Sequence, residues 1–390
     1  MRPDARVQAA IEVLGRWRGN DLPAERVLAD WGRANRYAGS GDRRAIADLV
    51  YDAIRRWCSA AWLVGSEEPR AVVLGTLLQA GADVDGLFSG TRHGPARLDA
   101  AERAAKAPAD LARAPWGIRL DLPDWLEAEL EGVPEEALAG LRHRAPLDLR
   151  VNRLKADRAD AIARLAEDGI EAVPGPLSAD CLRVVEGWHR VQRSGAYVAG
   201  LVEIQDAASQ AGAAFAQVQP GEHVVDFCAG GGGKALAMAA AQRGEGRIEA
   251  YDIAPARLAQ IPVRAARAGA EIAILSDADL AKRRGAADCI FVDAPCSGSG
   301  AWRRTPEAKW RLTPERLADL RAAQTRIISQ AAALMRPGGR LIYATCSLLH
   351  CENTDQIRTA EEENPALTCE LSHSWTDLNE GDGFFVAKLT

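Results

Sequence analysis

Val224–Lys234 reads VVDFCAGGGGK in one-letter code, a hydrophobic run followed by four glycines and a lysine. The run up to Phe227 has the β-branched and aromatic residues of a buried strand, and the glycines predict a tight turn that opens a helix. Glycine lets the backbone adopt positive φ and approach a ligand closely, while the first turn of a helix offers free N–H groups. The segment therefore predicts a strand, a ligand-facing turn and a helix, in the order typical of an α/β domain.

The same alternation of strand, turn and helix continues toward the C-terminus. The expected elements are, in order, His223–Phe227, Gly230–Ala241, Arg247–Tyr251, Pro255–Ala268, Ile272–Leu275, Cys289–Val292 and Arg340–Tyr343. This order predicts a doubly wound, Rossmann-like parallel sheet with right-handed crossovers. Two further expected strands, near Leu367–Leu371 and Phe384–Leu389, would close the sheet with an antiparallel edge.

The first 204 residues have a different pattern. Apolar residues recur at helical spacing from Ala5 to about Val64 and, less regularly, to Leu130. Strand-like and helical stretches then alternate after Pro146, at Leu147–Asn152, Arg158–Asp168 and Leu182–Val185. We therefore expect three domains: an all-helical domain over residues 1–140, a small α/β module over residues 141–204, and the Rossmann-like domain over residues 205–390.

Composition is that of a globular protein without a membrane span. The chain has 390 residues, is 47% hydrophobic, and carries a formal net charge of −6 at pH 7. We find no apolar run near the roughly 20 residues that cross a bilayer. The start at Met1–Asp4 leads into a charged amphipathic stretch, unlike a signal peptide. We therefore expect a cytoplasmic protein without membrane attachment.

Charge and cysteine spacing exclude further classes of protein. The negative net charge argues mildly against a protein that grips nucleic acid through overall charge. Residues 1–64 nevertheless carry eleven Arg against eight acidic residues, for which a GC-rich genome is the simpler explanation. The eight cysteines are scattered without a Cys-x-x-Cys pair, so neither a disulfide framework nor a structural metal site is expected.

Acidic residues after the next two expected strands point to an adenosine-containing cofactor at the glycine turn. Asp252 ends the second strand, where a carboxylate meets ribose hydroxyls, and Asp277 ends the third, where a side chain can touch an adenine edge. The arrangement suits both NAD and S-adenosylmethionine, because both contain adenosine. For Asp277, the role of an ordinary loop-capping acid is nearly as well supported.

Two cysteines lie in loops at expected strand ends. Cys296 belongs to the block DAPCSG, which begins at Asp293, and Cys346 belongs to the block YATCS. Carbon 5 of cytosine is a poor nucleophile, and a thiolate that adds to carbon 6 makes it reactive toward a methyl donor. Asp293 can bind the amide edge of the base, and Lys234 can place positive charge beside the ring. Together with the cofactor turn, the two thiols indicate covalent methyl transfer to a pyrimidine.

These motifs resemble the RsmB-type RNA (cytosine-5)-methyltransferases, the Sun family. Besides the glycine turn and the two cysteine blocks, the matching segments are Gln205–Gln210, Arg303–Trp310, Arg336–Gly339, Glu352–Asn353 and Gly381–Val386. Leu149–Lys155 looks like the RNA-facing module of this family, and Gly41–Tyr51 is similar to NusB-like helical RNA-binding domains. The resemblance covers nearly the whole chain.

The resemblance implies a mechanism and a set of site residues. It makes Cys346 the nucleophile and Cys296 the thiol that helps release the product, with Asp293 and Lys234 as further catalytic groups. It implies S-adenosylmethionine as the cofactor, bound by Cys228, Ala229, Gly230, Gly231, Gly232, Gly233, Lys234, Asp252, Arg257, Asp277 and Asp293. The implied substrate is a cytidine in small-subunit (16S) ribosomal RNA, with RNA contacts from Arg150, Asn152, Lys155, Arg303 and Arg304. We expect a monomer without a metal ion.

One position departs from the family pattern, and several alternatives stay open. The family has Ala-Pro where this chain has Gly230–Gly231, so we expect a more flexible turn and weaker cofactor preorganisation. Arg303 and Arg304 are equally well explained as surface salt-bridge residues. The same chemistry on transfer RNA and a non-catalytic RNA-binding assembly factor are alternative functions. A nicotinamide oxidoreductase would explain the glycine turn but neither thiol block.

Overall fold

The computed structural model describes residues 1–390 and divides the chain into two compact units. The helical unit comprises Met1–Arg144 and Trp302–Arg311. The α/β unit comprises Ala145–Ala301 and Leu312–Thr390. The small module and the Rossmann-like region thus belong to one compact unit, and a segment from the C-terminal half of the sequence belongs to the other.

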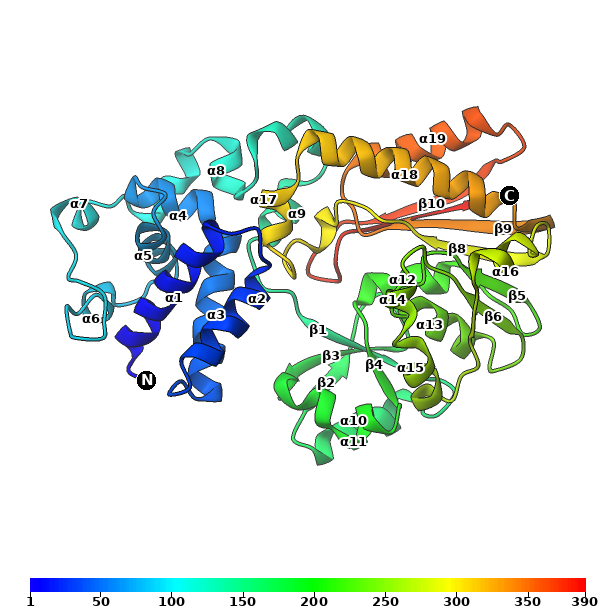
Figure 1. Cartoon of the computed structure of the whole chain (residues 1–390), viewed down its shortest axis with the longest axis horizontal. Helices are drawn as coiled ribbons and strands as arrows, with labels where there is room; N and C mark the ends of the chain where they lie inside the picture. Colours follow the sequence, from blue (N-terminus) through cyan, green and yellow to red (C-terminus); the bar gives the residue numbers. More distant parts are fainter. The chain divides into compact units, whose positions relative to one another are not determined.

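Short helices build the helical unit, as the sequence predicts for its N-terminal part (Figure 1). They are α1 (Pro3–Arg18), α2 (Ala24–Ala34), α3 (Ser40–Arg55), α4 (Trp57–Val64), α5 (Pro69–Gln79), α6 (Val84–Leu87), α7 (Ala100–Arg103), η1 (Pro108–Arg113), α8 (Trp116–Leu120), η2 (Asp124–Leu126), η3 (Ala128–Leu130), α9 (Glu135–Gly140) and α17 (Glu307–Arg311). Val13, Ile54 and Val72 are fully buried in a core shared by the first five helices. No helix of the chain combines the length and the apolar composition that a membrane crossing requires.

The segment Trp302–Arg311 completes the C-terminal end of α3. The indole Nε1 of Trp310 donates to the carbonyl of Ile54 at 2.8 Å, and Lys309 Nζ donates to the carbonyl of Arg55 at 2.8 Å. The last carbonyls of a helix have no partner within the helix, so these two side chains satisfy groups that α3 leaves open. The segment is therefore part of the helical unit by hydrogen bonding as well as by packing.

The small module contains a four-stranded antiparallel sheet in the order β2-β3-β1-β4. Its elements are β1 (Leu147–Val151), α10 (Arg158–Glu167), β2 (Glu171–Pro174), β3 (Cys181–Glu186), η4 (Trp188–Arg193), α11 (Gly195–Val198) and β4 (Val202–Ile204). Leu149 pairs with Leu182 on one side and with Ile204 on the other. Leu149, Leu182 and Leu165 of α10 are fully buried together, so α10 covers this sheet.

The larger sheet has seven strands in the order β10-β11-β9-β8-β5-β6-β7, and β10 and β11 form its antiparallel edge. The elements of this part are α12 (Ala207–Phe215), β5 (His223–Asp226), α13 (Gly233–Ala241), β6 (Arg247–Ala250), α14 (Pro255–Leu258), α15 (Ile261–Ala268), β7 (Ala273–Ile274), α16 (Asp277–Ala281), β8 (Ala287–Asp293), η5 (Ser299–Ala301), α18 (Pro314–Ala332), β9 (Met335–Thr345), η6 (His350–Glu352), α19 (Thr354–Glu363), β10 (Cys369–Trp375) and β11 (Phe384–Leu389). The predicted Rossmann-like sheet and its antiparallel edge are confirmed.

Helices cover both faces of this sheet (Figure 1). Val225 packs in one core cluster with residues of α18 and α19, whereas its neighbour Val224 packs in another with residues of α12 and α13. Successive residues of a strand point to opposite faces, so a central parallel strand must be apolar on both. This requirement explains the unbroken hydrophobic run in β5 and again in β8.

Several predicted elements differ from the structure in their extent: the helix expected from Gly230 begins at Gly233, the strand expected over Arg340–Tyr343 extends over Met335–Thr345, and two further elements are divided or shortened. The helix expected over Pro255–Ala268 is split into α14 and α15, with Pro262 in the first turn of α15. Proline has no N–H to donate to the preceding turn, so a helix begins there more easily than it continues. The strand expected over Ile272–Leu275 is reduced to Ala273–Ile274 at the edge of the sheet.

Candidate active site at the strand ends

The direction of winding changes between β5 and β8. From β5 the chain proceeds to β6 and β7 on one side, then crosses to β8 and β9 on the other. At such a switch point the carboxyl ends of neighbouring strands lead into loops that diverge, which leaves room for a ligand. Asp226 ends β5, Asp293 ends β8 and Cys346 follows β9. The three sequence motifs therefore meet at one edge of the sheet.

The glycine turn after β5 needs glycine for its backbone conformation. φ is +50° at Gly230 and +79° at Gly232, a region that residues with a Cβ adopt at a cost of about 1–2 kcal/mol. The N–H of Gly230 donates to Oδ2 of Asp252 at 3.0 Å, and Nη1 of Arg257 lies 3.0 Å from the same oxygen. Gly230 thus fits its place in the turn, although the sequence comparison with the family pattern suggested only added flexibility.

Asp226 is a buried carboxylate beside this turn. It is 1% exposed, and neither side-chain oxygen has a hydrogen-bond partner in the protein. Burial, and then the negative charge of Asp293, raise the pKa of Asp226 to about 7. The neighbouring carboxyl groups of Asp226 and Asp293 suit a ligand that brings positive charge, and S-adenosylmethionine carries an ammonium and a sulfonium group. The anionic pyrophosphate of NAD is the poorer match to a pair of carboxylates.

The other two predicted cofactor acids have different surroundings. Asp252 is 3% exposed and is engaged by the turn, as described above. Asp277 is exposed, and its Oδ1 accepts the hydroxyl hydrogen bond of Tyr251 at 2.8 Å. Ser276, not Asp277, caps α16 through its side chain. Asp277 is therefore free of a capping role and lies with Tyr251 after β6 and β7.

Lys234 and Asp293 form an ion pair across the switch point. Lys234 Nζ lies 2.6 Å from Oδ2 of Asp293 and 5.2 Å from the ring centroid of Phe384. The lysine side chain is 11% exposed. Burial alone would lower the pKa of Lys234, but the charge and hydrogen bond of Asp293, followed by the charge of Cys346, raise it. The site therefore holds a fixed ammonium next to Cys346.

The two predicted thiols meet. Sγ of Cys296 lies 3.5 Å from Sγ of Cys346, within hydrogen-bond distance for sulfur, and both residues are half-buried. The hydrogen bond with Cys346 and burial raise the pKa of Cys296 well above that of an ordinary thiol. The N–H of Gly300 donates to the carbonyl of Cys346 at 3.0 Å, which ties the two loops together a second time.

A fully buried carboxylate, Glu352, lies behind both thiol loops. Oε1 of Glu352 accepts the N–H of Ser297 at 2.8 Å and Nε2 of Gln324 at 3.0 Å. Oε2 accepts the hydroxyl of Ser347 at 2.6 Å and also that of Ser297. From the sequence, Glu352 is only part of a segment that matches the family, because neither its spacing nor its neighbours indicate a contact with residues 297 and 324.

Two protein-family models match parts of this chain. Residues 213–390 match the 16S rRNA methyltransferase RsmB/F model, and residues 122–191 match the ferredoxin-like domain of RsmF/B-like methyltransferases. The Ribosomal RNA small subunit methyltransferase B of Salmonella paratyphi B is 32% identical over an alignment of 285 residues that covers 68% of this chain and 66% of that protein. The chain belongs to the RsmB/F methyltransferase family. The matched part spans 66% of the length of this relative and of the protein of the same name from Salmonella heidelberg.

Solved structures share the fold of this RsmB/F family member. A methyltransferase homolog protein from Pyrococcus horikoshii has a TM-score of 0.61 at 23% identity, covering 73% of this chain and 99% of its own. NSun6 from Pyrococcus horikoshii has a TM-score of 0.60 at 18% identity, covering 68% and 97%. Membership in a methyltransferase family supports S-adenosylmethionine as the cofactor, in agreement with the prediction. The NusB-like character of the helical unit stays a prediction.

Two residues of the small module that the family resemblance assigned to RNA are structural. Arg150 is 5% exposed, and its Nε donates to Oε1 of Gln205 at 2.6 Å. Asn152 is 2% exposed, and its Nδ2 donates to the carbonyls of Gly200 and Ala268, each at 2.8 Å. The structure thus uses these buried donors within the protein, and the RNA contacts of Arg150 and Asn152 stay predictions.

The third predicted RNA-binding residue of the module, Lys155, is exposed. Its Nζ donates to the carbonyls of Ala199 at 3.0 Å and Arg267 at 2.6 Å. One ammonium has three N–H groups, so a further contact with a phosphate is compatible with these two bonds. An RNA contact of Lys155 stays a prediction.

The two arginines after the Cys296 block are also different from each other. Arg303 is 3% exposed, and its carbonyl accepts Nε of Arg55 at 2.9 Å inside the helical unit. A surface salt bridge does not suit a side chain that is buried, and the RNA contact of Arg303 stays a prediction. Arg304 is half-buried, and its RNA contact stays a prediction.

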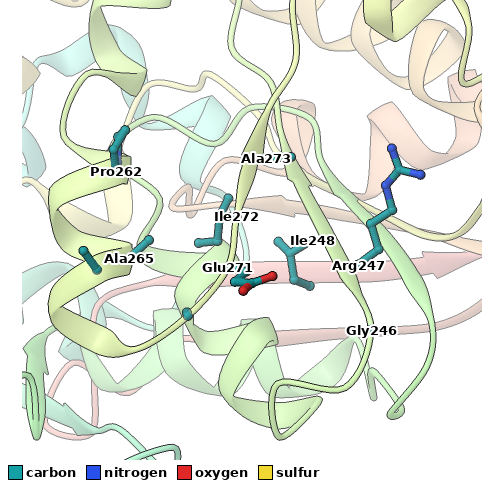
Figure 2. A pocket seen from close by; sticks show the side chains of 10 residues that line it. Gly246, Arg247, Ile248, Pro262, Ala265, Glu271, Ile272 and Ala273 are labelled. Carbon is teal, nitrogen blue, oxygen red and sulfur yellow. The ribbon is translucent and has the colours of Figure 1, made fainter.

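A pocket elsewhere in the α/β unit is not part of this site. It lies among β6, α15 and β7, where Ile248, Ala265 and Ile272 form an apolar wall and Arg247 stands at the start of β6 (Figure 2). The residues that line this pocket include no cysteine. It reaches the amino end of β6, whereas the thiols and the glycine turn follow carboxyl ends of strands.

Proposed function

We propose that this chain transfers the methyl group of S-adenosylmethionine to carbon 5 of a cytidine in small-subunit ribosomal RNA, through a covalent bond between Cys346 and carbon 6. The observation that carries the proposal is the pair of thiols 3.5 Å apart at the same strand ends as the Lys234–Asp293 ion pair. A nicotinamide oxidoreductase would explain the glycine turn, but hydride transfer requires neither thiol. Relatives named as small-subunit ribosomal RNA methyltransferases support the class of substrate.

The first step needs a nucleophile beside a cation. Cys346, as a thiolate, adds to carbon 6 of the ring, and the electron pair of the carbon 5–carbon 6 double bond becomes available at carbon 5. The ammonium of Lys234 attracts the thiolate and the negative charge that develops on the ring. Asp293 holds this ammonium in place at 2.6 Å and can accept a hydrogen bond from the amino group of the base. Bound S-adenosylmethionine supplies an electrophilic methyl group.

Product release reverses the addition. The proton on carbon 5 passes to a base, the double bond forms again, and the carbon 6–sulfur bond breaks with its electron pair returning to Cys346. Cys296 is the candidate to assist the departure of Cys346, because its S–H can donate to the departing sulfur, which lies 3.5 Å from its own. A base inside a helix cannot reach the thiol, so a cytidine in a single-stranded loop or at a helix end is the expected target.

The decisive experiment is transfer of labelled methyl from S-adenosylmethionine to unmodified small-subunit ribosomal RNA, with the modified nucleotide identified by mass spectrometry. Transfer RNA serves as the parallel substrate. Label in ribosomal 5-methylcytidine is the expected result. Label in transfer RNA alone would keep the chemistry and change the substrate, and no label in either RNA would favour a non-catalytic assembly factor.

The two cysteine variants test the covalent step. We expect Cys346→Ala to abolish turnover, because no other group supplies the addition to carbon 6. We expect Cys296→Ala to accumulate a covalent RNA–protein species, visible as a gel shift that survives denaturation. Wild-type rates in Cys346→Ala would refute the mechanism, and the absence of an adduct in Cys296→Ala would refute the release role of that thiol.

A further inference from the structure

Glu352 joins the loops that carry the two thiols. Its carboxylate accepts hydrogen bonds from Ser297 and Ser347, which directly follow Cys296 and Cys346. Each serine belongs to a different loop, so a single carboxylate fixes both loops behind the sulfur atoms. Glu352 is 0% exposed, so solvent does not compete for these bonds.

The residues on either side of each cysteine are held in the same way. Gln324, which donates to Glu352, also donates to the carbonyl of Pro295 at 2.9 Å. Asn353 donates to the carbonyl of Ser347 at 2.9 Å and accepts the hydroxyl of Thr345 at 2.6 Å. Cys296 is therefore held through residues 295 and 297, and Cys346 through residues 345 and 347.

The carboxylate is also a buried negative charge with neutral hydrogen-bond donors around it. A backbone N–H, an amide and serine hydroxyls hold it in place without neutralising it. The titratable groups that face Cys296 are Cys346, Glu352 and the buried hydroxyl of Tyr343, and the Lys234–Asp293 pair lies beside Cys346. The negative charge of Glu352 therefore lies behind both thiol loops, while the ammonium of Lys234, paired with Asp293, lies beside Cys346.

We propose that Glu352 is a positioning residue that assigns different roles to the two thiols: it fixes the spacing of their loops, and its charge keeps Cys296 protonated while Cys346 attacks the base. This inference rests on the proposed function, since it explains why two thiols 3.5 Å apart do not compete as nucleophiles. The hydrogen bond to Cys346, burial and the charge of Cys346 raise the pKa of Cys296 most, and the charge of Glu352 raises it further.

The variant that isolates the charge is Glu352→Gln. Glutamine has the size of glutamate, keeps one carbonyl oxygen for the N–H of Ser297, and offers an amide N–H₂ to the two serine hydroxyls, which can also accept. The matched control is Ser347→Ala, which removes one hydrogen bond from the same carboxylate and leaves its charge in place. The two variants thus separate charge from hydrogen bonding.

The test is alkylation of the whole protein with iodoacetamide over a pH series, without RNA or methyl donor, with each cysteine peptide quantified by mass spectrometry. In the wild type, the midpoint for labelling of Cys296 should lie above that of a free thiol. In Glu352→Gln we expect the midpoint for Cys296 to fall, with several-fold faster labelling at neutral pH. In Ser347→Ala the midpoint should stay near the wild-type value.

Three results would overturn the proposal: an unchanged midpoint in Glu352→Gln, an equal shift in Ser347→Ala, or a wild-type midpoint at or below that of a free thiol. Cys289 is 0% exposed and reports on folding, because it stays unlabelled only in a folded protein. The wild-type measurement tests the inference even if Glu352→Gln does not fold. Labelling needs no RNA, so its outcome is distinct from a failure to transfer methyl groups, which would refute the proposed function.

Discussion

The α/β unit and the helical unit each contain a buried lysine, and their surroundings shift the pKa values of the two lysines in opposite directions. Lys234 follows the glycine turn and lies 2.6 Å from Asp293, and the net effect of its surroundings raises its pKa. Lys309 lies in the segment Trp302–Arg311 and is 1% exposed. Its Nζ donates to a neutral carbonyl, and burial lowers the pKa of Lys309 to about 8.

The difference between the two lysines shows how an ionised partner changes the pKa of a buried ammonium group. Burial disfavours the ammonium in both places. At Lys234 a carboxylate in direct contact outweighs that cost, so the site keeps a fixed positive charge. At Lys309 the charge of Asp121 is attractive but does not outweigh burial. Lys234 is therefore suited to act on a developing negative charge, whereas Lys309 is suited to hold α3 through a hydrogen bond.

The largest expected effect is that of Lys234→Met on methyl transfer. Removal of the ammonium leaves both the Cys346 thiolate and the charge on the ring without their cation, so we expect kcat/KM to fall by about 10²–10³. Steady-state transfer of labelled methyl to ribosomal RNA measures it. Lys282→Met is the matched control, because Lys282 is an exposed lysine paired with Asp279 on α16. We expect the control to stay within about twofold of wild type, in line with the small worth of exposed ion pairs. An equal loss of kcat/KM in both variants would contradict a specific role of the Lys234 ammonium in the reaction.

The sequence predicts the α/β fold and the meeting of the two thiols because both depend on local patterns. Each motif follows a hydrophobic run that can only be a central strand, and parallel strands bring their carboxyl ends to one edge. The pairing of Lys234 with Asp293 follows from the same rule, since β5 and β8 are neighbours. Strand order and strand ends therefore give the main part of the site.

The parts that could not be predicted depend on contacts across long sequence separations. Nothing local indicates that Lys309 enters the helical unit, because an Arg- and Lys-containing segment after an active-site loop has the composition of an RNA contact. Arg150 alternates with apolar residues in β1, and alternation does not show whether the polar face is solvated or covered. Glu352 is similar: its partners come from residues 297, 324 and 347, which only the folded chain brings together.

The second largest expected effect is that of Lys309→Met on the pH dependence of stability, and the direction of this dependence follows from the lowered pKa of Lys309. Between about pH 8 and the ordinary lysine value near 10.4, the unfolded chain binds a proton at this residue and the folded chain does not, so stability rises with pH. The shift corresponds to about 3 kcal/mol over that range. In Lys309→Met this contribution is absent. Urea unfolding of both proteins at pH 8 and pH 10 measures the difference. Parallel pH dependence in the two proteins would show that Lys309 is not the buried base that its burial implies.

The smallest effect concerns the backbone that holds Lys234. Gly230 has φ of +50°, and a Cβ there would lie 3.0 Å from Nη2 of Arg257. We expect Gly230→Ala to lower the free energy of unfolding by about 1 kcal/mol, mainly through the left-handed backbone.

Gly233 is the matched control, because its φ is not positive and the nearest atom to a Cβ is Nη2 of Arg264 at 3.9 Å. Gly233→Ala should be neutral or stabilising, since it removes backbone entropy from the unfolded chain at the first residue of α13. Equal destabilisation by both substitutions would mean that any added side chain destabilises the turn. The cost at Gly230 would then come from the space around the turn that holds Lys234 and not from the left-handed backbone conformation.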